Sequence, residues 1–387
     1  MQSSLRIGMD VRLLAKRRGI GNYVHNLLEA VAASDTRHRF VLYGDHEELR
    51  AVAPADDRFE VRIMSPKIYP VWEQLALPVQ AGRDGVDLLH CPANAGPLWM
   101  PRDVGLVLTV HDVMYMLPES QLPVSPSLYQ RLGRAYLRRV VPSAVRHARA
   151  VLTISRYSRS DICRHLGVKA ETVDVIHEAA GRTFRPLAND EAEARLRGFG
   201  LRRSFFVTLG AIDPRKNTLF TIEAFARLVA QGEQEHDLVI VGLAPKAREH
   251  FAQHLRARNL GPRVHLLGFV TEEELTALYG RATAILYPSL YEGFGIPILE
   301  GMACGTPVVG SVHASIPEIA GDAALLIDTV EPEMLTAAMA RILGDVGLRR
   351  ELIARGRKRA AEFSWDKLAK ETLAVYERVS RPGTGIN

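Results

Sequence analysis

Cysteine is scarce in this chain, and long apolar runs are missing. Three cysteines occur in 387 residues, and none of them forms a Cys-x-x-Cys spacing, so neither a metal cluster nor a disulfide framework is expected. No apolar run is long enough for a membrane-spanning helix; the longest, such as Val104–Val110, has the length of a strand. Residues Leu5–Asp10 have the pattern of a first core strand rather than of a signal peptide. We therefore expect a cytoplasmic globular protein with free thiols and no bound metal.

Acidic residues are absent from residues 121–160, which makes this stretch strongly cationic. Its eight arginines are Arg131, Arg134, Arg138, Arg139, Arg146, Arg149, Arg156 and Arg159. A cationic face attracts anionic lipid, nucleic acid or phosphorylated substrates, although a simple solvated helix face is the alternative. Because no nucleic-acid-binding motif accompanies the charge, we predict no nucleic-acid partner. We keep the hypothesis that Arg131–Arg149 makes a peripheral contact with anionic lipid at the inner face of the cell membrane.

Strand and helix patterns alternate along the chain, and the alternation starts again after residue 200. This pattern predicts parallel sheets covered by helices, and the length of 387 residues predicts two such domains. The expected strands are Arg6–Asp10, Phe40–Tyr43, Val86–His90, Val104–Val110, Ala150–Ile154, Ser204–Leu209, Asp237–Val241, Val264–Leu267, Ala284–Tyr287, Thr306–Gly310 and Ala324–Ile327. The expected helices include Asn22–Ala33 and Thr218–Gln231.

The domain boundaries follow from the same alternation. We predict an N-terminal doubly wound domain over residues 1–185, a polar linker over 186–200 and a second doubly wound domain over 201–363. The tail, 364–387, begins with helical periodicity, and we consider that its helix crosses back onto the first domain. Ligands of such sheets bind at the carboxyl ends of the strands, so site residues should directly follow strands.

The most informative segment is Tyr287–Val309, which predicts a strand, a glycine-containing loop and a helix that begins near Ile296. The backbone N–H groups of Gly295 and Ile296 would open the helix and could hold phosphate oxygens there. Glu292 in the loop and Glu300 in the helix stand on either side of this anion cradle. A ligand with phosphate in the middle and hydroxyl groups at both ends has the matching layout, and a nucleotide-sugar is such a ligand.

The Glu-x7-Glu pair in this setting resembles the signature of the family 4 retaining glycosyltransferases. The resemblance implies the GT-B fold, an α/β architecture of two Rossmann-like domains facing a central cleft, in which the first domain binds the acceptor and the second the nucleotide-sugar. It also implies that Glu300 binds the ribose hydroxyls, that Glu292 lies at the donor sugar as a catalytic residue, and that Phe294, Gly295 and Ile296 bind the donor. The alternative is a solvated loop glutamate followed by a glutamate that the helix dipole favours.

A basic pair follows the strand that ends at Leu209. Residues 210–217 contain adjacent Arg215 and Lys216, which suit a diphosphate because Arg binds it bidentately and Lys as a point charge. The segment resembles the donor-diphosphate site of the family. This implies catalytic roles for both cations and a donor-binding role for Gly210. An exposed basic pair at the start of a helix is the alternative.

Two further strand ends carry predicted donor contacts. His111 follows the strand ending at Val110, and the resemblance places the matching histidine of the family at the donor sugar, with Asp112 as its orienting partner. Phe269 and Val270 follow another strand, where the family holds the nucleotide base through backbone contacts. The alternatives are a structural histidine and an ordinary exit from a strand.

A glycine-containing loop opens the first helix, and it is similar to the N-terminal loop with which the family approaches donor phosphate and acceptor. Its residues are Gly19, Ile20, Gly21, Asn22 and Tyr23. The loop also imitates a dinucleotide fingerprint, but Val24 replaces the third glycine, and residues 11–18 separate the loop from the first strand. We therefore predict no nicotinamide cofactor, nor any other.

The donor and the acceptor are predicted only from the resemblance to known enzymes. The segment Ser315–Glu318, together with the glycine loop, looks most like bacterial mannosyltransferases of polysaccharide or O-antigen assembly; we interpret Glu318 itself as structural. This likeness implies mannose from GDP-mannose as the donor group, and a hydroxyl of a glycan or of a polyprenyl-diphosphate-linked glycan as the acceptor. The sequence has no Asp-x-Asp, so we expect a metal-independent reaction in which basic side chains and helix N-termini stabilise the diphosphate.

Three alternatives stay open at this stage. One is a nucleotide-sugar epimerase of similar architecture. A second is an NAD-dependent oxidoreductase, which leaves the segment from Glu292 to Glu300 unexplained. The third is a non-catalytic protein that binds a sugar nucleotide, although this would require a broken site and the predicted residues are all present.

Overall fold

The computed structural model describes residues 4–16, 19–118 and 128–380, and it divides into two compact units. Unit 1 comprises Met1–Leu117, Ser125–Glu178 and Ser364–Asn387, and unit 2 comprises Pro118–Val124 and Ala179–Phe363. The first part of the acid-free stretch, 121–127, lies outside the described residues, as do Arg17 and Arg18. Within the described ranges, no helix combines the length and the apolar character needed to cross a bilayer.

Unit 1 is built on a sheet of seven parallel strands in the order β3-β2-β1-β4-β5-β6-β7. The strands are β1 Arg6–Asp10, β2 Arg39–Gly44, β3 Phe59–Ile63, β4 Leu88–Cys91, β5 Gly105–Thr109, β6 Ala150–Thr153 and β7 Val173–Val175. The helices are α1 Ile20–Ala32, α2 Leu49–Val52, α3 Tyr69–Val71, α4 Leu77–Arg83, α5 Leu128–His147, α6 Arg156–Leu166 and α15 Trp365–Val379, with a π-helical turn Trp72–Ala76 between α3 and α4. Strands β4 and β5 are fully buried, which explains their largely apolar sequence.

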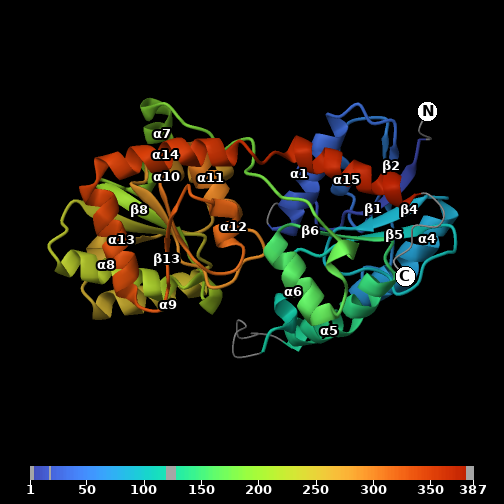
Figure 1. The fold of residues 1–387 in the computed structure, drawn as a ribbon, viewed down its shortest axis with the longest axis horizontal. Coiled ribbons are helices and arrows are strands. Elements are labelled where there is room, and N and C mark those ends of the chain that lie inside the picture. The colour runs from blue at the N-terminus through green and yellow to red at the C-terminus, as the bar shows by residue number, and fades with distance from the viewer. Residues whose placement is uncertain (1–3, 17–18, 119–127, 381–387) are drawn as a thin grey trace. The chain divides into compact units, whose positions relative to one another are not determined.

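Unit 2 has six parallel strands in the order β10-β9-β8-β11-β12-β13, the arrangement of a Rossmann sheet. The strands are β8 Ser204–Leu209, β9 His236–Val241, β10 Val264–Leu266, β11 Ala284–Tyr287, β12 Val308–Ser311 and β13 Leu325–Ile327. The helices are α7 Asn189–Leu196, α8 Thr218–Ala230, α9 Pro245–Ala257, α10 Glu272–Arg281, α11 Ile296–Cys304, α12 Ile316–Ala320, α13 Pro332–Gly344 and α14 Val346–Ala360. Helices α8, α9 and α13 cover one face of this sheet and α10, α11 and α14 the other (Figure 1).

Both sheets reverse their strand order at one point, and these two points decide where ligands can bind. In unit 1 the reversal lies between β1 and β4, and in unit 2 between β8 and β11. Loops that leave neighbouring strands at such a point diverge to opposite faces and open a crevice at the carboxyl end of the sheet. The predicted α/β class with two Rossmann-like sheets is thus confirmed.

The last helix of the chain packs on the first. Helix α15 lies along α1 within unit 1, where the red and blue ribbons run side by side (Figure 1). Its Tyr376 is fully buried, and the hydroxyl lies 2.6 Å from Nδ1 of the equally buried His90 on β4. Burial lowers the pKa of His90 to about 3, so the imidazole is neutral and this hydrogen bond joins two uncharged groups. Ser364 caps the helix by accepting from the backbone N–H of Lys367 at 3.1 Å.

The predicted linker, 186–200, needs correction. It contains helix α7, which packs against α10 inside unit 2. The polar composition that suggested a linker belongs to a mostly exposed helix that buries Ala192 and Leu196. The chain passes from unit 1 to unit 2 earlier, between Glu178 and Ala179.

Candidate active site

The predicted diphosphate cation and the predicted sugar carboxylate contact each other in unit 2. Lys216 follows β8 and Glu292 follows β11, and these strands are neighbours at the point where the order reverses. The Lys216 Nζ lies 2.6 Å from Oε1 of Glu292. The same Nζ lies 3.4 Å from the hydroxyl of Tyr287 and 5.2 Å from the centroid of its ring. The topology therefore places a cation, a carboxylate and a buried phenol together at the carboxyl ends of the two central strands β8 and β11.

Arg215, the second predicted cation, is held within its own turn. A short 3-10 turn, Pro214–Lys216, begins after Asp213, whose carboxylate accepts from the backbone N–H of Arg215 at 3.0 Å. The Arg215 guanidinium also pairs with this carboxylate, with Nε 3.1 Å from each oxygen. Together with the Lys216–Glu292 pair, the four charges sum to zero. Each of the two cations is thus paired with a carboxylate.

The loop between β11 and α11 is held on its β8 side by backbone groups of the basic turn. The backbone N–H of Leu290 donates to the carbonyl of Arg215 at 2.7 Å. The side-chain amide of Asn217 donates to the carbonyl of Pro288 at 3.3 Å. These bonds fix the loop that carries Glu292 relative to the turn that carries Lys216.

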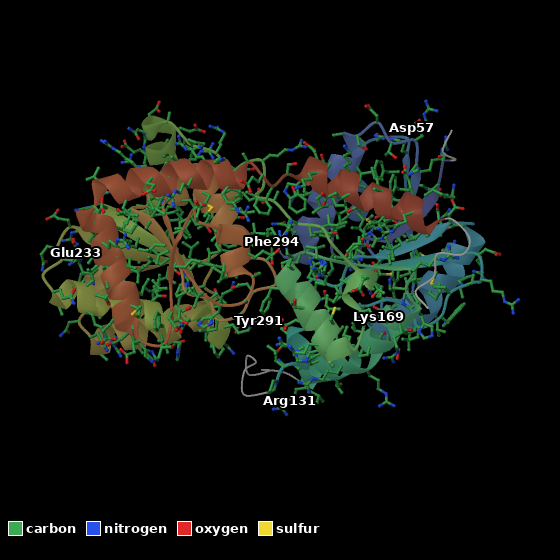
Figure 2. The ribbon with its side chains drawn as sticks, viewed as in Figure 1. Asp57, Arg131, Lys169, Glu233, Tyr291 and Phe294 are labelled. Atoms are coloured by element: carbon green, nitrogen blue, oxygen red, sulfur yellow. The ribbon has the colours of Figure 1, made fainter. Side chains whose placement is uncertain are left out.

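Two buried serines hold the same loop on its β12 side. The Ser315 hydroxyl lies 2.7 Å from the carbonyl of Phe294 and 3.0 Å from that of Glu292. The Ser311 hydroxyl donates to the carbonyl of Ser289 at 2.5 Å. Phe294 and Tyr291, labelled in Figure 2, lie on this loop, and both side chains are buried. A loop held on both sides presents the Glu292 carboxylate in a defined position.

Helix α11 begins as predicted, directly after the loop. Its N-cap, Gly295, has φ 103°, a left-handed conformation that a larger side chain adopts only with strain. Ile296 is the first helical residue, and Glu300 lies about one turn further along, partly buried. The helix N-terminus and Glu300 thus lie beside the loop of Glu292 in one continuous segment.

The remaining donor-binding predictions fall on other strand ends of unit 2. At Gly210, a Cβ atom would come within 2.3 Å of the Ile240 side chain, so the glycine is required by packing between β8 and β9. Phe269, after β10, is 56% exposed, and Val270 is partly buried. Among the described residues, no cluster of three or more His, Cys, Asp or Glu is placed to hold a metal ion.

In unit 1, His111 is buried at the end of β5 and is held on several sides. Its backbone N–H donates to the side-chain oxygen of Asn94 at 2.7 Å, and its Nε2 lies 2.9 Å from the carbonyl of Pro92. Its Nδ1 lies 3.3 Å from Oε1 of the buried Glu178, and the Tyr23 ring meets the imidazole edge to face at 4.7 Å. A carbonyl can only accept, so Nε2 donates to it, and Nδ1 faces the Glu178 carboxylate.

The structure places a carboxylate other than the predicted Asp112 against the His111 ring. The Asp112 carboxylate accepts from the backbone N–H of Met114 at 3.0 Å and so caps the next short turn. The orienting carboxylate belongs to Glu178, which follows β7. The sequence does show an acidic residue, Glu178, shortly after a strand. That it pairs with His111 follows only from the strand order β5-β6-β7, which the sequence does not give.

The glycine loop of unit 1 opens helix α1 as predicted, and its residues differ in exposure and in contacts. Gly19 is the exposed N-cap of α1 with φ 50°, and Ile20 and Asn22 are partly buried in the first turn. Gly21 is required by packing, because a Cβ there would lie 1.7 Å from the carbonyl oxygen of Lys16. Tyr23 is buried, with its hydroxyl 3.4 Å from Oγ1 of Thr109, so its side chain supports His111 from inside.

Comparison with known families decides the identity. A profile described as glycosyl transferases group 1 matches residues 191–359, and one described as Glycosyltransferase Family 4 matches residues 17–179. The chain belongs to the family 4 glycosyltransferases. It is therefore an enzyme that transfers a sugar, and the GT-B fold class predicted from the sequence is confirmed.

Curated relatives of this glycosyltransferase include several mannosyltransferases. It is 29% identical to the O-antigen chain mannosyltransferase B of Escherichia coli over 70% of each chain. It is 34% identical to the MMP alpha-(1->4)-mannosyltransferase of Mycolicibacterium hassiacum over 59% of this chain and 54% of that protein. The serotype-specific mannosyltransferase WbdA of Escherichia coli is 26% identical over 70% of this chain, which spans only 33% of WbdA.

Solved structures of similar fold cover nearly the whole glycosyltransferase. The sucrose-phosphate synthase of Thermosynechococcus elongatus matches with a TM-score of 0.72 at 22% identity, over 97% of this chain and 98% of that chain. WaaG, a glycosyltransferase of lipopolysaccharide biosynthesis, matches with a TM-score of 0.71 at 18% identity, over 97% and 100%. Anabaena HepE in complex with UDP and glucose matches with a TM-score of 0.72 at 17% identity, over 96% and 99%.

Stability should depend on pH through Glu300. Burial raises the pKa of the Glu300 carboxyl from 4.5 to about 8, and the negative charge of Glu272 adds to this shift. A carboxyl with a raised pKa in the folded state stabilises the fold fully below its unfolded value, and this contribution is lost as pH rises through about 8. We expect the melting temperature to fall between pH 7 and pH 9 by several degrees more in the wild type than in Glu300→Gln, followed by circular dichroism. Equal pH slopes would contradict this prediction, and Glu273→Gln, an exposed neighbour of Glu272, is the control.

Proposed function

We propose that this glycosyltransferase moves mannose from GDP-mannose to a hydroxyl of a glycan or of a polyprenyl-diphosphate-linked glycan, with retention at the anomeric carbon and without a metal ion. The observation that carries the proposal is the Lys216–Glu292 contact at the ends of β8 and β11, beside the N-terminus of α11. The mannosyltransferase relatives support the choice of sugar. The two matching family models are both of glycosyltransferases, which argues against the epimerase and oxidoreductase alternatives.

The charges define what each group does in the proposed reaction. When a donor diphosphate binds, Lys216 and Arg215 turn from their carboxylates to the phosphate oxygens and stabilise the leaving group. Glu292 is then freed to face the sugar, where its negative charge stabilises the oxocarbenium-like transition state. The bond between the anomeric carbon and the diphosphate breaks, and the acceptor oxygen bonds to the same face. The acceptor proton passes to the departing diphosphate; a double displacement through a carboxylate nucleophile is the competing scheme.

Other assigned residues complete the proposal. Glu300 binds the ribose hydroxyls, the amides of Gly295 and Ile296 hold phosphate oxygens, and the backbone at Phe269 and Val270 contacts the base. These roles rest on the family resemblance, on the position of Gly295, Ile296 and Glu300 in the first turns of α11, and on the position of Phe269 and Val270 after β10. The roles of His111 at the donor sugar and of the loop Gly19–Tyr23 stay predictions.

The acceptor proposal includes a peripheral contact between Arg131–Arg149 and anionic lipid. Arg131, at the N-terminal end of α5, points outward from unit 1 (Figure 2), and Arg139 and Arg146 are also exposed. Arg138 is different, because its guanidinium donates to the carbonyls of Tyr115 and Leu117. The lipid contact would thus rest on part of the arginine-rich helix only.

A donor-hydrolysis screen tests the proposed function. The purified enzyme is given GDP-mannose and GDP-, UDP-, dTDP- and ADP-glucose, and release of nucleoside diphosphate is measured with and without excess EDTA. We expect GDP-mannose to be hydrolysed fastest, at a rate that EDTA does not change, because Lys216 and Arg215 replace a metal. Binding is followed in parallel by thermal shift, in which GDP should stabilise the protein and NAD should not.

Three outcomes would overturn parts of this proposal. Faster hydrolysis of a UDP-sugar would replace the donor, a result that the HepE complex with UDP makes worth testing. Turnover that is lost in EDTA and restored by Mg²⁺ or Mn²⁺ would refute the metal-independent reaction. Stabilisation by NAD alone would reinstate the oxidoreductase hypothesis for the glycine loop.

A further inference from the structure

Unit 1 exposes a group of large apolar side chains that its own fold leaves uncovered. We call this group the apolar surface; its members are Ile68, Val71, Leu75, Leu98, Trp99, Leu128 and Leu132. Ile68 is 65% exposed, Leu128 71% and Leu132 61%. Exposed apolar residues scattered singly are normal, but several in one place indicate an interaction site.

Hydrogen bonds and ring contacts show that three separate segments of chain meet at this surface. The indole N–H of Trp99 donates to the carbonyl of Gln74 at 2.8 Å, and the Gln74 side-chain amide donates to the hydroxyl of Tyr136 at 2.9 Å. The rings of Tyr69 and Tyr136 lie 5.6 Å apart. Leu132 is one helical turn before Tyr136 on α5. The exposed apolar side chains thus come from neighbouring segments, 68–75, 98–99 and 128–132.

The exposed charges on residues 64–75 and on helix α5, two of the segments that form the apolar surface, are of one sign. The segment from 64 to 75, which includes α3, carries Lys67 and one acid, Glu73. Glu73 is only 1% exposed, and it accepts hydrogen bonds from Tyr69 and Tyr136, each at 2.6 Å. Its carboxylate therefore lies beneath the surface, and Lys67 is the exposed charge of this segment.

Helix α5 mixes leucine and arginine on one exposed face. Leu128 and Leu132 are four residues apart, as are Arg131 and Ala135, and Arg139 continues the second row. All five are exposed. The long arginine side chains can keep their guanidinium groups at the phosphate level of a bilayer while the leucines enter the acyl boundary.

We propose that the apolar surface docks unit 1 on an anionic lipid bilayer. The side chains of Ile68, Leu75, Trp99 and Leu132 enter the boundary between headgroups and acyl chains, and Lys67, Arg131 and Arg139 contact lipid phosphates. The inference rests on the proposed lipid contact of Arg131–Arg149 and adds the apolar residues that anchor it. A second copy of this chain fits less well, because a self-paired contact would place two cationic rims against each other.

Vesicle sedimentation tests the docking. The full chain is mixed with acceptor-free vesicles of phosphatidylcholine alone or with added phosphatidylglycerol, and the bound fraction is measured. We expect binding to the anionic vesicles, reduced at least about tenfold by Ile68→Ser with Leu132→Ser, because two apolar side chains no longer enter the acyl boundary. Arg131→Gln with Arg139→Gln should reduce the binding by a similar factor, because two cations no longer contact lipid phosphates.

A matched pair of substitutions in unit 2 is the control. Val330 and Met334 are 77% and 47% exposed, and replacing both with serine should leave vesicle binding unchanged. Wild-type binding by the Ile68→Ser, Leu132→Ser variant overturns the proposal. So does a wild-type dimer in light scattering that these substitutions dissociate, because it identifies a second copy as the occupant. Donor hydrolysis without vesicles, expected at the wild-type rate in these variants, separates failure of the docking from failure of the transferase proposal.

Discussion

Replacing Lys216 with alanine should lower turnover at least about a hundredfold, the loss expected when one group that stabilises developing charge is removed. Two effects should act together. In the proposed reaction the departing diphosphate loses a cation, and Glu292 loses the partner whose Nζ lies 2.6 Å away. The unpaired carboxylate then adds a negative charge near the phosphates. Glu292→Gln should lower turnover by a similar factor, because it removes the charge that faces the sugar.

The measurement is kcat and KM for the preferred donor in purified variants, with Lys246→Ala as the control. Lys246 is an exposed lysine on α9 of the same unit, so it matches Lys216 in charge change but not in position. A fall in kcat with little change in KM indicates a loss confined to the transition state. Wild-type rates in both Lys216→Ala and Glu292→Gln would remove the pair from the site.

The second large effect concerns stability, and it lies in unit 1. Glu178→Ala should lower the free energy of unfolding of this unit by about 3 kcal/mol, because it removes the buried carboxylate that faces Nδ1 of the buried His111. Glu178→Gln should cost about 1 kcal/mol, since an amide N–H can still donate to Nδ1 while Nε2 keeps the carbonyl of Pro92. The difference between the two variants isolates the hydrogen bond.

Tryptophan fluorescence makes this measurement specific to one unit. The chain has three tryptophans, Trp72, Trp99 and Trp365, and all of them belong to unit 1. Urea unfolding followed by fluorescence therefore reports the unit that contains Glu178, even when unit 2 unfolds separately. Glu171→Ala, an exposed acid of unit 1, is the control. Equal midpoints for Glu178→Ala and the wild type would show that the contact contributes nothing to stability.

Most strands could be predicted because they lie in the middle of parallel sheets. Strands such as Ser204–Leu209 and Ala284–Tyr287 are mostly buried, and their sequences are largely apolar between polar loops. The two strands that escaped prediction are edge strands. Phe59–Ile63 is only partly buried and carries Glu60 and Arg62, and Val173–Val175 has three residues. Their sequence patterns are too weak to separate from loop.

The site could be predicted in its chemistry but not in its pairings. The segment that holds Glu292 and Glu300 is continuous, so its loop and helix follow from local glycine and periodicity patterns. The contact of Lys216 with Glu292 depends on β8 lying next to β11, and that of His111 with Glu178 depends on the order β5-β6-β7. Strand order is a tertiary property. Tyr287 and Ser315, which lie beside Glu292, escaped prediction for the same reason.

The packing of α15 on α1 has a consequence for biosynthesis. A ribosome makes the chain from its first residue, and unit 1 includes both the beginning of the chain and the segment after Phe363. All of unit 2 between Ala179 and Phe363 must therefore be translated before the nascent unit 1 can receive its last helix. Unit 1 is thus begun before unit 2 and completed after it, and until then the surface of α1 that α15 covers stays accessible to chaperones.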